Sequence, residues 1–561
     1  MSRLLPLTPI HVIQGSDLRS PFASKTVRIR GVVTGRSRKG YFVQDPNGSE
    51  DPLCSDAIFV YSPRRKARVG LLLELVGNVV DFSRGENGRP TTQLKVLETR
   101  ELRKDGPTIE PVWLTADRLP AEAAELARYL NGLEGMLVGI SAGSTFAAPS
   151  NPFGDYVCVP AGIEAVRTEN GGVVIDAENP QRWLPGFRIT NYGIAPKLNV
   201  GAKLLAPVVG PLNFRADSFQ IVAQAGIEVE DAQVVHGRVS FEPVADRTTI
   251  LTLNGFNLDV HVEDAAKVLN PDRDIDDDKL YGRFELLARA IVEQAGAPDI
   301  IALQEIQDND GAELTDVVDA SETYLQLIKD IQWLGGPEYD WADIPPARES
   351  DGGQPGGNIR NAFLYNPERV ELKKSSLQRV GVDAPEFAGS RKPLMARFRI
   401  RASGSELAVV NVHLASKRHQ NSIFAPENPG HDAREETRIR QAEIVRDSLS
   451  DVRTSGVDFY VTGDFNDFEF SRTLRALCGD DSVNMVETLP LAQRYDYNHR
   501  GQLQVLMHGV VSKRSHEGGA VEYEILHGNE LAGVKPGSVS GKATDHAYVI
   551  ARMQVGATGS R

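Results

Sequence analysis

Polar side chains that could bind a metal ion or move a proton follow several apolar runs in the part of the chain from residue 249 onward. Asn254 follows TILTL, Glu305 follows IIALQ, and His413 follows AVVNV. A sheet holds the ends of its strands rigidly, so such positions often carry binding or catalytic groups. The same placement recurs further along the chain, in Asp464 and Asn466 after DFYVTG and in Asp545 and His546 before AYVIAR.

The types of these side chains indicate the chemistry that they could support. Asp, Glu and Asn supply hard oxygen ligands, and no cysteine is suitably placed among them, which favours Mg²⁺ or Mn²⁺ over Zn²⁺. A phosphate ester is then the expected ligand. Taken alone, GDFND could equally form an Asx turn without any catalytic role. The ordered series of such strand ends favours the chemical interpretation.

The surrounding elements change in character along the chain. Residues 8–108 contain five β-rich runs with Gly, Asn and Pro breaks, which predict a small OB-like barrel. Residues 112–238 add further short strands and one helical stretch, which we interpret as a second β-rich, OB-like module. From 246 to 556 strands alternate with helices, as in one α+β domain built on two packed sheets.

Composition and charge narrow the class of protein. The chain has 561 residues, 41% of them hydrophobic and 25% charged, which excludes collagenous, largely disordered and coiled-coil chains. The net charge is −14, yet residues 1–110 hold 18 Lys and Arg against 12 Asp and Glu, or +6. This asymmetry fits a basic module that binds a polyanion, although ordinary variation of surface charge is an alternative. Aromatic residues that could stack on bases in this module are Tyr41, Phe42, Phe59 and Tyr61; by strand alternation at least half must point into the barrel core.

A series of motifs in the C-terminal region resembles the endonuclease/exonuclease/phosphatase superfamily, the group of pancreatic deoxyribonuclease and exonuclease III. In order along the chain, these motifs are TLNGFNL, IIALQEIQ, GGNIRNAFLYNPERV, SRKPLMARF, VVNVHLASKR, VTGDFND and TDHAYVI. The N-terminal runs, such as SPFASKTVRIRGVVT and GYFVQDP, are similar to the OB-like module that precedes this domain in bacterial extracellular nucleases. The resemblance implies a four-layered α/β sandwich that hydrolyses phosphodiesters or phosphomonoesters with a divalent metal.

The resemblance also implies roles for individual residues. Glu305 would be the main metal ligand, with Asn254 and Asp545 in or next to the coordination sphere. Asp464 would position or deprotonate the attacking water, and Asn466 would fix that group and the phosphate. The remaining assignments are contacts with the scissile phosphate, which the family pattern gives to His413, His546, Arg391 and Arg360; Arg360 could instead be a surface salt-bridge residue.

One position departs from the family pattern. The family usually has an Asp in a Leu-Asp-His segment, where it orients the last catalytic histidine, and Met507 stands there in LQVLMHGVVS. A thioether cannot accept a strong hydrogen bond from imidazole, and losing the orienting carboxylate of a comparable triad costs about 10⁴ in rate. Three interpretations are open: a slow enzyme, replacement by another carboxylate such as Glu522 or Glu524, or a drift toward binding. The other retained residues favour an active enzyme.

The sequence therefore predicts a Mg²⁺- or Mn²⁺-dependent nuclease of low sequence specificity, with DNA favoured over RNA and the choice between them left open. The alternatives are a phosphatase or phosphodiesterase for a small or lipid phosphate ester, and a catalytically weak nucleic-acid-binding protein. No protein partner is implied. Three widely spaced cysteines and an N-terminus without a signal-like apolar run suit an unexported protein, although the resembled family is often extracellular. No apolar run is long enough to span a bilayer.

Overall fold

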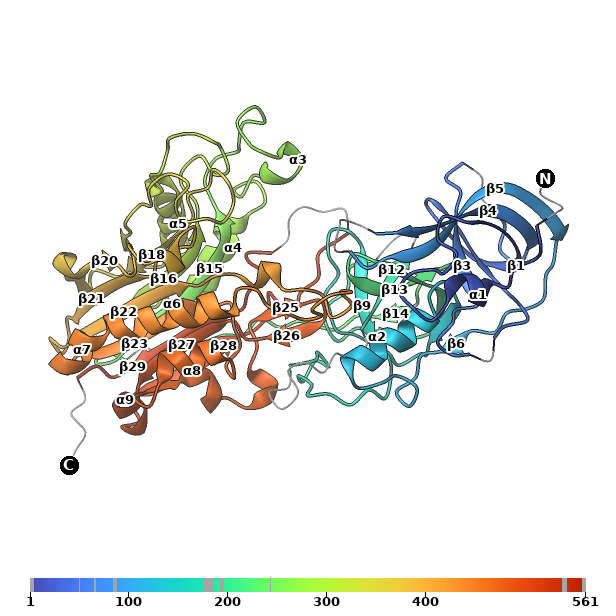
Figure 1. Cartoon of the computed structure of the whole chain (residues 1–561). Helices are drawn as coiled ribbons and strands as arrows, with labels where there is room; N and C mark the ends of the chain where they lie inside the picture. The colour runs from blue at the N-terminus through green and yellow to red at the C-terminus, as the bar shows by residue number, and fades with distance from the viewer. Residues whose placement is uncertain are drawn as a thin grey trace.

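The computed structural model describes most of the chain. The described residues are 5–49, 51–64, 67–83, 88–175, 186–191, 196–242, 244–536 and 542–556. Within them, no helix combines the length and the apolar character needed to cross a membrane. Figure 1 shows the barrel strands β1–β5 on one side of the molecule, the α/β layers on the other, and the strands of a middle module between them.

The N-terminal strands close into a barrel in the order β1-β2-β3-β5-β4. Side chains that point inward from alternate positions of the strands, including Ile29, Val43 and Leu75, fill the barrel core together with α1. This alternation is the sequence pattern that predicted a barrel there. The elements are α1 (Ile10–Gln14), β1 (Thr26–Ser37), β2 (Gly40–Gln44), β3 (Ala57–Tyr61), β4 (Leu72–Phe82) and β5 (Thr91–Arg103).

The middle module is also β-rich, but its strands follow an open path instead of a closed one. They form a nine-stranded sheet in the order β14-β11-β8-β9-β10-β13-β12-β7-β6. The helix α2 packs Leu126 and Leu130 into the core of this module. The elements are β6 (Val112–Trp113), α2 (Ala123–Gly132), β7 (Leu137–Ile140), β8 (Thr145–Phe146), β9 (Asp155–Val159), β10 (Phe187–Asn191), β11 (Lys203–Leu204), β12 (Val208–Arg215), β13 (Ser218–Ala223) and β14 (Val229–Glu230).

The C-terminal region contains two large sheets that pack face to face. The first follows the order β17 (Asp340–Ala342), β18 (Arg360–Tyr365), β16 (Ile300–Ile306), β15 (Thr248–Leu258), β29 (Tyr548–Met553), β28 (Val521–Leu526). The second follows β19 (Val370–Leu372), β21 (Leu394–Ile400), β22 (Glu406–His413), β23 (Asp458–Asp464), β27 (Met507–Ser512), β24 (Ser482–Asn484), with β20 (Gln378–Arg379) paired to β21. A separate ribbon joins β25 (Tyr497–His499) to β26 (Gln502–Gln504).

Helices cover the outer faces of both sheets and complete four layers. One apolar cluster lies between the sheets and includes Phe363, Val409 and Met507. A second joins the first sheet to α4, η2 and α5, and a third joins the second sheet to α6 and α8. The predicted four-layered α/β sandwich is therefore confirmed. The helices are α3 (Pro271–Asp274), α4 (Arg283–Arg289), η2 (Ala290–Gln294), α5 (Ser321–Trp333), α6 (Glu435–Ser448), α7 (Ser450–Ser455), α8 (Arg472–Cys478) and α9 (Lys513–Glu517), with short 3₁₀ turns η3 (Lys374–Ser376), η4 (Pro385–Phe387), η5 (Lys417–His419), η6 (Met485–Thr488) and η7 (Leu491–Gln493).

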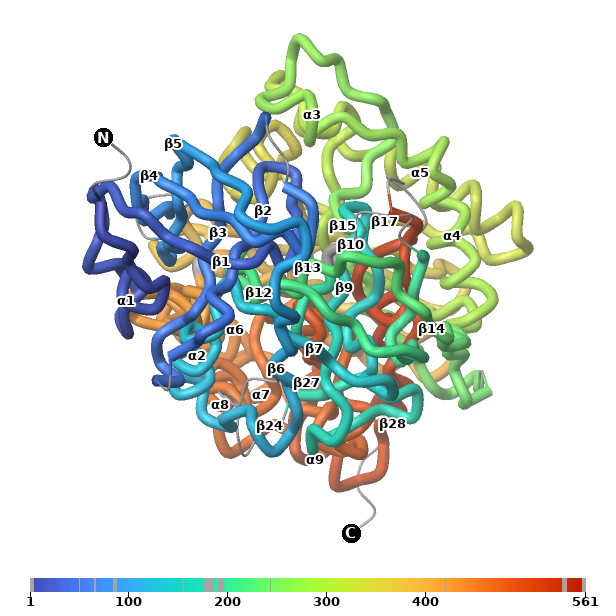
Figure 2. The backbone as a smooth tube through the Cα atoms, turned by 90° about the vertical axis from the view of Figure 1, so that its right-hand side faces the viewer, coloured from blue at the N-terminus to red at the C-terminus, as the bar shows by residue number. Residues whose placement is uncertain are grey.

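The middle module packs directly on the β25–β26 ribbon. Leu503 of the ribbon exchanges backbone hydrogen bonds with the 173–175 segment, donating to Val173 at 2.8 Å and accepting from Ile175 at 3.0 Å. Val174, Leu503 and Tyr495 share one apolar cluster. In Figure 2 the barrel and the middle module lie toward the viewer, in front of the two-sheet region. The ribbon is thus held from both sides, by the sandwich and by the middle module.

Candidate active site

The second sheet brings His413 and Asp464 side by side. β22 and β23 are parallel, and His413 is the register partner of Asp464 at their carboxyl ends. His413 Nε2 lies 3.8 Å from Asp464 Oδ2, and both residues are buried. Continuous apolar runs precede both residues, as expected for parallel strands covered on both faces. Two residues 51 positions apart in the chain therefore share one strand edge.

The first sheet places Asn254 and Glu305 opposite this pair. β15 and β16 are also parallel, with Asn254 in register with the residue before Glu305. Asn254 Nδ2 donates to Asp464 Oδ2 at 3.4 Å, and Glu305 Oε1 lies 3.7 Å from His413 Nε2. Glu305 has a φ of 53°, a left-handed conformation that is uncommon for this residue type and is often found at functional sites. The two sheets thus meet at one polar centre.

The loop before β29 adds Asp545 and His546 to the centre. His546 Nε2 lies 3.7 Å from Asp464 Oδ2 and 4.0 Å from Asp545 Oδ1. His546 is buried, whereas a third of the Asp545 side chain is exposed to solvent. The structure therefore gathers Asn254, Glu305, His413, Asp464, Asp545 and His546 in one place.

The strand that carries Met507 does not supply a partner for His546; a residue from outside that strand does. Asp496, which is fully buried, accepts a hydrogen bond from His546 Nδ1 through Oδ1 at 2.8 Å. Its other oxygen accepts from the backbone N–H groups of Leu506 and Met507 at 2.7 and 2.9 Å. Met507 itself packs in the apolar layer between the sheets. The carboxylate lost at position 507 is therefore replaced by one that Met507 helps to hold.

The two carboxylates that the sequence suggested as replacements have other partners. Glu522 forms ion pairs with Arg247 and Arg552, and Glu524 accepts hydrogen bonds from Ser240. Both lie on β28, at the edge of the first sheet. The weak signal that could have found Asp496 is its position in YDYNH, directly before a short strand and close in sequence to Met507.

Burial and neighbouring charges shift the pKa values of the two histidines in opposite directions. Burial, together with the positive charges of Arg391 and His546, holds the pKa of His413 well below its ordinary value. Burial also acts to lower the pKa of His546, but the hydrogen bond to Asp496 and the nearby carboxylates outweigh it and raise that pKa to about 10. At neutral pH the site therefore contains one neutral imidazole and one imidazolium.

The buried carboxylates of the centre have too few positive charges nearby to offset the cost of their burial. Burial, followed by the charge of Asp545, raises the pKa of Glu305. Burial also raises the pKa of Asp464, against the opposing effect of His546. Crowded carboxylates with raised pKa values are typical of a cation-binding site.

The donor atoms present fit a hard divalent cation. One ligand atom each from Glu305, His413 and Asp464 lies within 4.8 Å of the others. Asp545 lies next to this group, and Asn254 faces it with its amide, whose Nδ2 donates to Asp464. A set composed mainly of carboxylate and amide oxygens suits Mg²⁺ or Mn²⁺.

Asn466 and Arg391 lie beside the centre and converge on one carbonyl. Asn466 Nδ2 and Arg391 Nη2 donate to the carbonyl oxygen of Leu414 at 3.2 and 3.1 Å. The backbone N–H of Asn466 also donates to Asp464 Oδ1 at 2.8 Å, which fixes that carboxylate. Arg391 is buried, and its Nε has no hydrogen-bond partner in the described part of the chain.

Arg360 does not lie with these residues. It is buried, pairs with Asp343 at 3.3 Å, and donates to the carbonyl oxygens of Val318 and Asn358. These contacts tie β18 to the loops that follow β16. We therefore assign Arg360 a structural position in place of the phosphate contact expected from the family pattern, and its burial also excludes the surface salt bridge.

The barrel aromatics divide between core and surface. Tyr41 and Phe42 are almost fully buried, whereas Phe59 is half-buried and Tyr61 is exposed. The residues of β2 are buried on both faces, partly because Gln44 accepts a hydrogen bond from Leu137 of the middle module. Only Phe59 and Tyr61 of the four candidates are therefore left for stacking on bases.

The fold and the site together give two packed sheets with a carboxylate, amide and histidine centre at the strand ends. Residues 279–518 match the model of the Endonuclease/Exonuclease/phosphatase family. The C-terminal domain belongs to this superfamily, whose members hydrolyse phosphodiesters or phosphate esters. Residues 127–232 match a domain of unknown function, DUF8508. No curated protein matches the chain.

Several solved structures are similar to the C-terminal domain. A humanized D. rerio TDP2 is 14% identical, with coverage of 55% of this chain and 98% of that one and a TM-score of 0.36. The human Nocturnin catalytic domain with bound sulfate is 15% identical, with coverage of 56% and 96% and a TM-score of 0.37. A Bacteroides thetaiotaomicron mannosyl-6-phosphatase is 15% identical, with coverage of 54% and 98% and a TM-score of 0.33.

Proposed function

We propose that this protein is a divalent-metal-dependent nuclease that hydrolyses phosphodiester bonds in DNA with little sequence specificity. The observation that carries the proposal is the chain of contacts from Asp496 through His546 to Asp464, placed opposite Glu305. This arrangement combines a fixed imidazolium, a carboxylate next to it and a cation site. These are the groups that hydrolysis of a phosphodiester requires.

Each residue of the centre has its own role in the proposed hydrolysis. Asp464 positions the attacking water and accepts its proton, because Asn254 and the backbone N–H of Asn466 hold its carboxylate in place. His546, kept protonated by Asp496, donates to a phosphoryl oxygen as negative charge develops there. Arg391 and neutral His413 bind the remaining phosphate oxygens. Preorganised donors of this kind stabilise the transition state without reorganisation.

Glu305, Asn254 and Asp545 would hold Mg²⁺ or Mn²⁺ at this centre. The bound metal supplies Lewis-acid stabilisation of the phosphoryl oxygens. Burial and then the charge of Asp545 raise the pKa of Glu305, and a cation held by these residues would favour the charged carboxylate. The same residues would accept either metal, because oxygen ligands do not discriminate strongly between the two.

The basic N-terminal region supports nucleic acid as the substrate. Residues 1–110 carry a net charge of +6 in a chain whose total is −14. Lys and Arg on such a module bind phosphates without reading sequence, and exposed Tyr61 and half-buried Phe59 offer faces for stacking. Low sequence specificity follows from contacts of this kind.

The test is cleavage of supercoiled plasmid by the purified full-length protein with Mg²⁺, Mn²⁺ or EDTA. Asp464→Asn retains the size of the side chain and should abolish nicking, whereas Asp447→Asn, on an exposed side chain, should leave it intact. Metal-dependent nicking that is lost only in Asp464→Asn supports the proposal. Absence of nicking with either metal, together with turnover of a small phosphate monoester, contradicts it.

A further inference from the structure

A cleft between the middle module and the C-terminal domain opens onto the candidate active site. It encloses about 640 Å³, within the usual range of ligand sites. Its lining includes Asp545 and Thr544 of the site loop, and Arg188 and Ser218 of the middle module. A molecule bound at the metal centre can therefore extend into space that the two-sheet fold does not create by itself. We name this space the inter-module cleft.

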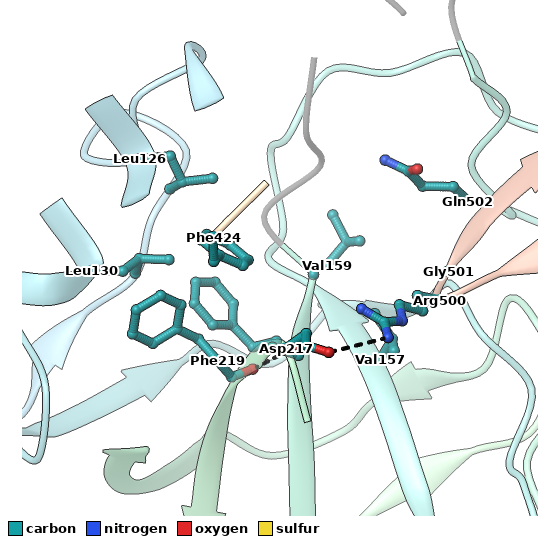
Figure 3. Close-up of a pocket in the computed structure, with 13 residues that line it drawn as sticks. Leu126, Leu130, Val157, Val159, Asp217, Phe219, Phe424, Arg500, Gly501 and Gln502 are labelled. Atoms are coloured by element: carbon teal, nitrogen blue, oxygen red, sulfur yellow. Dashed lines mark hydrogen bonds and ion pairs between the residues drawn. The ribbon is translucent and has the colours of Figure 1, made fainter. Parts of the chain in front are cut away.

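The middle-module wall of the cleft is fixed in place. Ser150 Oγ donates to the carbonyl of Val534 at 2.8 Å, and Asn498 Nδ2 donates to the carbonyl of Ala147 at 2.9 Å. On the opposite side of the junction, Phe424 from the C-terminal domain inserts into the core of the middle module and packs edge-on against Phe219, with ring centroids 5.1 Å apart (Figure 3). A wall anchored in this way is preorganised for binding.

An exposed aromatic ring lies in the cleft, close to the metal centre. Phe256 is 47% exposed and lines the cleft two residues after Asn254. Its φ of 54° is rare for an aromatic residue. The conformation is held because its N–H donates to Asn254 Oδ1 at 2.8 Å and its carbonyl accepts from Arg283. Strain of this kind persists where the surroundings enforce it, commonly at binding sites.

Cationic side chains from both parts of the protein line the same cleft. Arg188 comes from β10, whereas Arg500 follows β25 and Lys542 precedes Asp545. Arg500 is 44% exposed and lies 4.0 Å from Asp217 across the junction, as drawn in Figure 3. The lining also includes the acidic residues Asp272, Asp276 and Asp278, of which Asp278 is paired with Arg283. The cleft therefore combines cationic and acidic side chains.

We propose that the inter-module cleft binds a single strand of nucleic acid next to the scissile phosphate, with a base stacked on Phe256 and phosphates on Arg188 and Arg500. An exposed aromatic ring combined with arginines is how proteins bind single strands without reading sequence. The inference rests on the proposed nuclease function. It assigns to the middle module a role in holding the substrate, which makes that module one wall of the substrate site.

The test compares two substrates in the full-length protein. One is a single-stranded oligonucleotide, and the other is bis(4-nitrophenyl) phosphate, a diester too small to reach beyond the metal centre. Phe256→Ala and the double variant Arg188→Ala/Arg500→Ala should each lower kcat/KM for the oligonucleotide about tenfold. Both should leave kcat/KM for the small diester unchanged. Phe256→Trp, which keeps an aromatic face, should retain activity on the oligonucleotide.

Trp333→Ala is the matched control, because Trp333 is 76% exposed on the outer helix α5 and does not line the cleft. Equal losses on both substrates, or no loss on the oligonucleotide, overturn the cleft assignment while the nuclease function stands. Duplex DNA serves as a third substrate, and an equal loss of kcat/KM on duplex and single-stranded DNA in the Phe256 and arginine variants overturns the preference for a single strand. Wild-type protein that cleaves the small diester but no nucleic acid overturns the nuclease function itself.

Discussion

Asp496 Oδ1 lies 2.8 Å from Nδ1 of His546, although the two residues are 50 positions apart in the chain. The contact fixes the orientation of the His546 ring and leaves Nε2 directed toward Asp464 and Asp545. It also accounts for Met507 at the position where the family usually has the orienting Asp. Asp496, directly before the β25–β26 ribbon, supplies the carboxylate that the family pattern places on the strand.

Asp496→Asn should reduce kcat about 10³- to 10⁴-fold with little change in KM, because an amide can present the wrong hydrogen-bonding group to His546. Steady-state cleavage of an oligonucleotide measures the effect. Glu524→Gln, on an edge-strand side chain bonded to Ser240, is the matched control and should retain full activity. A loss of less than tenfold in Asp496→Asn would show that His546 does not depend on this partner.

The pKa of His546 should fall toward its ordinary value of about 6.5 when Asp496 is replaced by Asn. In the wild-type protein this pKa is raised to about 10, so the stabilisation from charged His546 is fully present below about pH 6.5 and is lost as the pH rises through 10. Histidine-selective NMR of the metal-free protein, with His546→Gln to assign the signal, measures the titration. An unchanged titration in Asp496→Asn contradicts the assigned cause.

Met507→Asp should not raise turnover, because Asp496 already orients His546. Met507 is fully buried between the sheets, so an added carboxylate there lies beside Asp496 without a partner. The free energy of unfolding should fall by about 3–5 kcal/mol. Chemical denaturation measures this loss, and Met507→Leu should cost less than about 1.5 kcal/mol. A gain in kcat would mean that His546 is poorly oriented in the natural protein.

Glu305→Gln should weaken Mn²⁺ binding more than about tenfold, since it removes the central carboxylate of the cation site. Calorimetric titration of the purified protein with Mn²⁺ measures the affinity independently of any activity. Glu285→Gln, on the exposed face of α4 where Glu285 pairs with Arg289, should bind Mn²⁺ as the wild type does. Equal affinity in the two variants would place the metal elsewhere.

Phe424→Ala should lower the free energy of unfolding by about 3 kcal/mol, because the ring fills the core of the middle module beside Phe219 and Phe214. The middle module should also become more sensitive to protease, since an anchor to the C-terminal domain is removed. Phe153→Ala, at a ring that is 87% exposed, should change neither property. Unchanged stability in Phe424→Ala would contradict the anchoring role.

The fold class could be predicted because its signals are local. Apolar strand runs, helical periodicity and strand-end polar residues such as Glu305 and Asp464 depend on neighbours within one element. Parallel pairing then brings those strand ends to the same edge of a sheet. The strand-end residues identified in the sequence therefore meet at one site in the structure. The open sheet of the middle module could not be predicted from the sequence, because short strands specify neither their order nor whether the sheet closes.

Arg360 and the barrel aromatics have contacts that local sequence patterns could not predict. An arginine before a strand has the same sequence pattern whether it contacts phosphate or Asp343, and only the packing of the loops after β16 determines which. Phe42 was a candidate for stacking because alternation alone cannot say that a strand is covered on both faces. In the structure every residue of β2 is buried, Phe42 packs against Phe59, and Gln44 accepts a hydrogen bond from Leu137 of the middle module.

The sequence alone determined the type of chemistry, since the ordered motifs supply the carboxylates, amides and histidines of a metal-dependent phosphoester hydrolase. It could not determine which carboxylate partners His546. Asp496 reaches that position only because the β25–β26 ribbon is folded back between the sandwich and the middle module and because the N–H groups of Leu506 and Met507 hold the carboxylate. Partners that depend on long-range packing leave no periodic trace in the chain, so only the tertiary structure decided them.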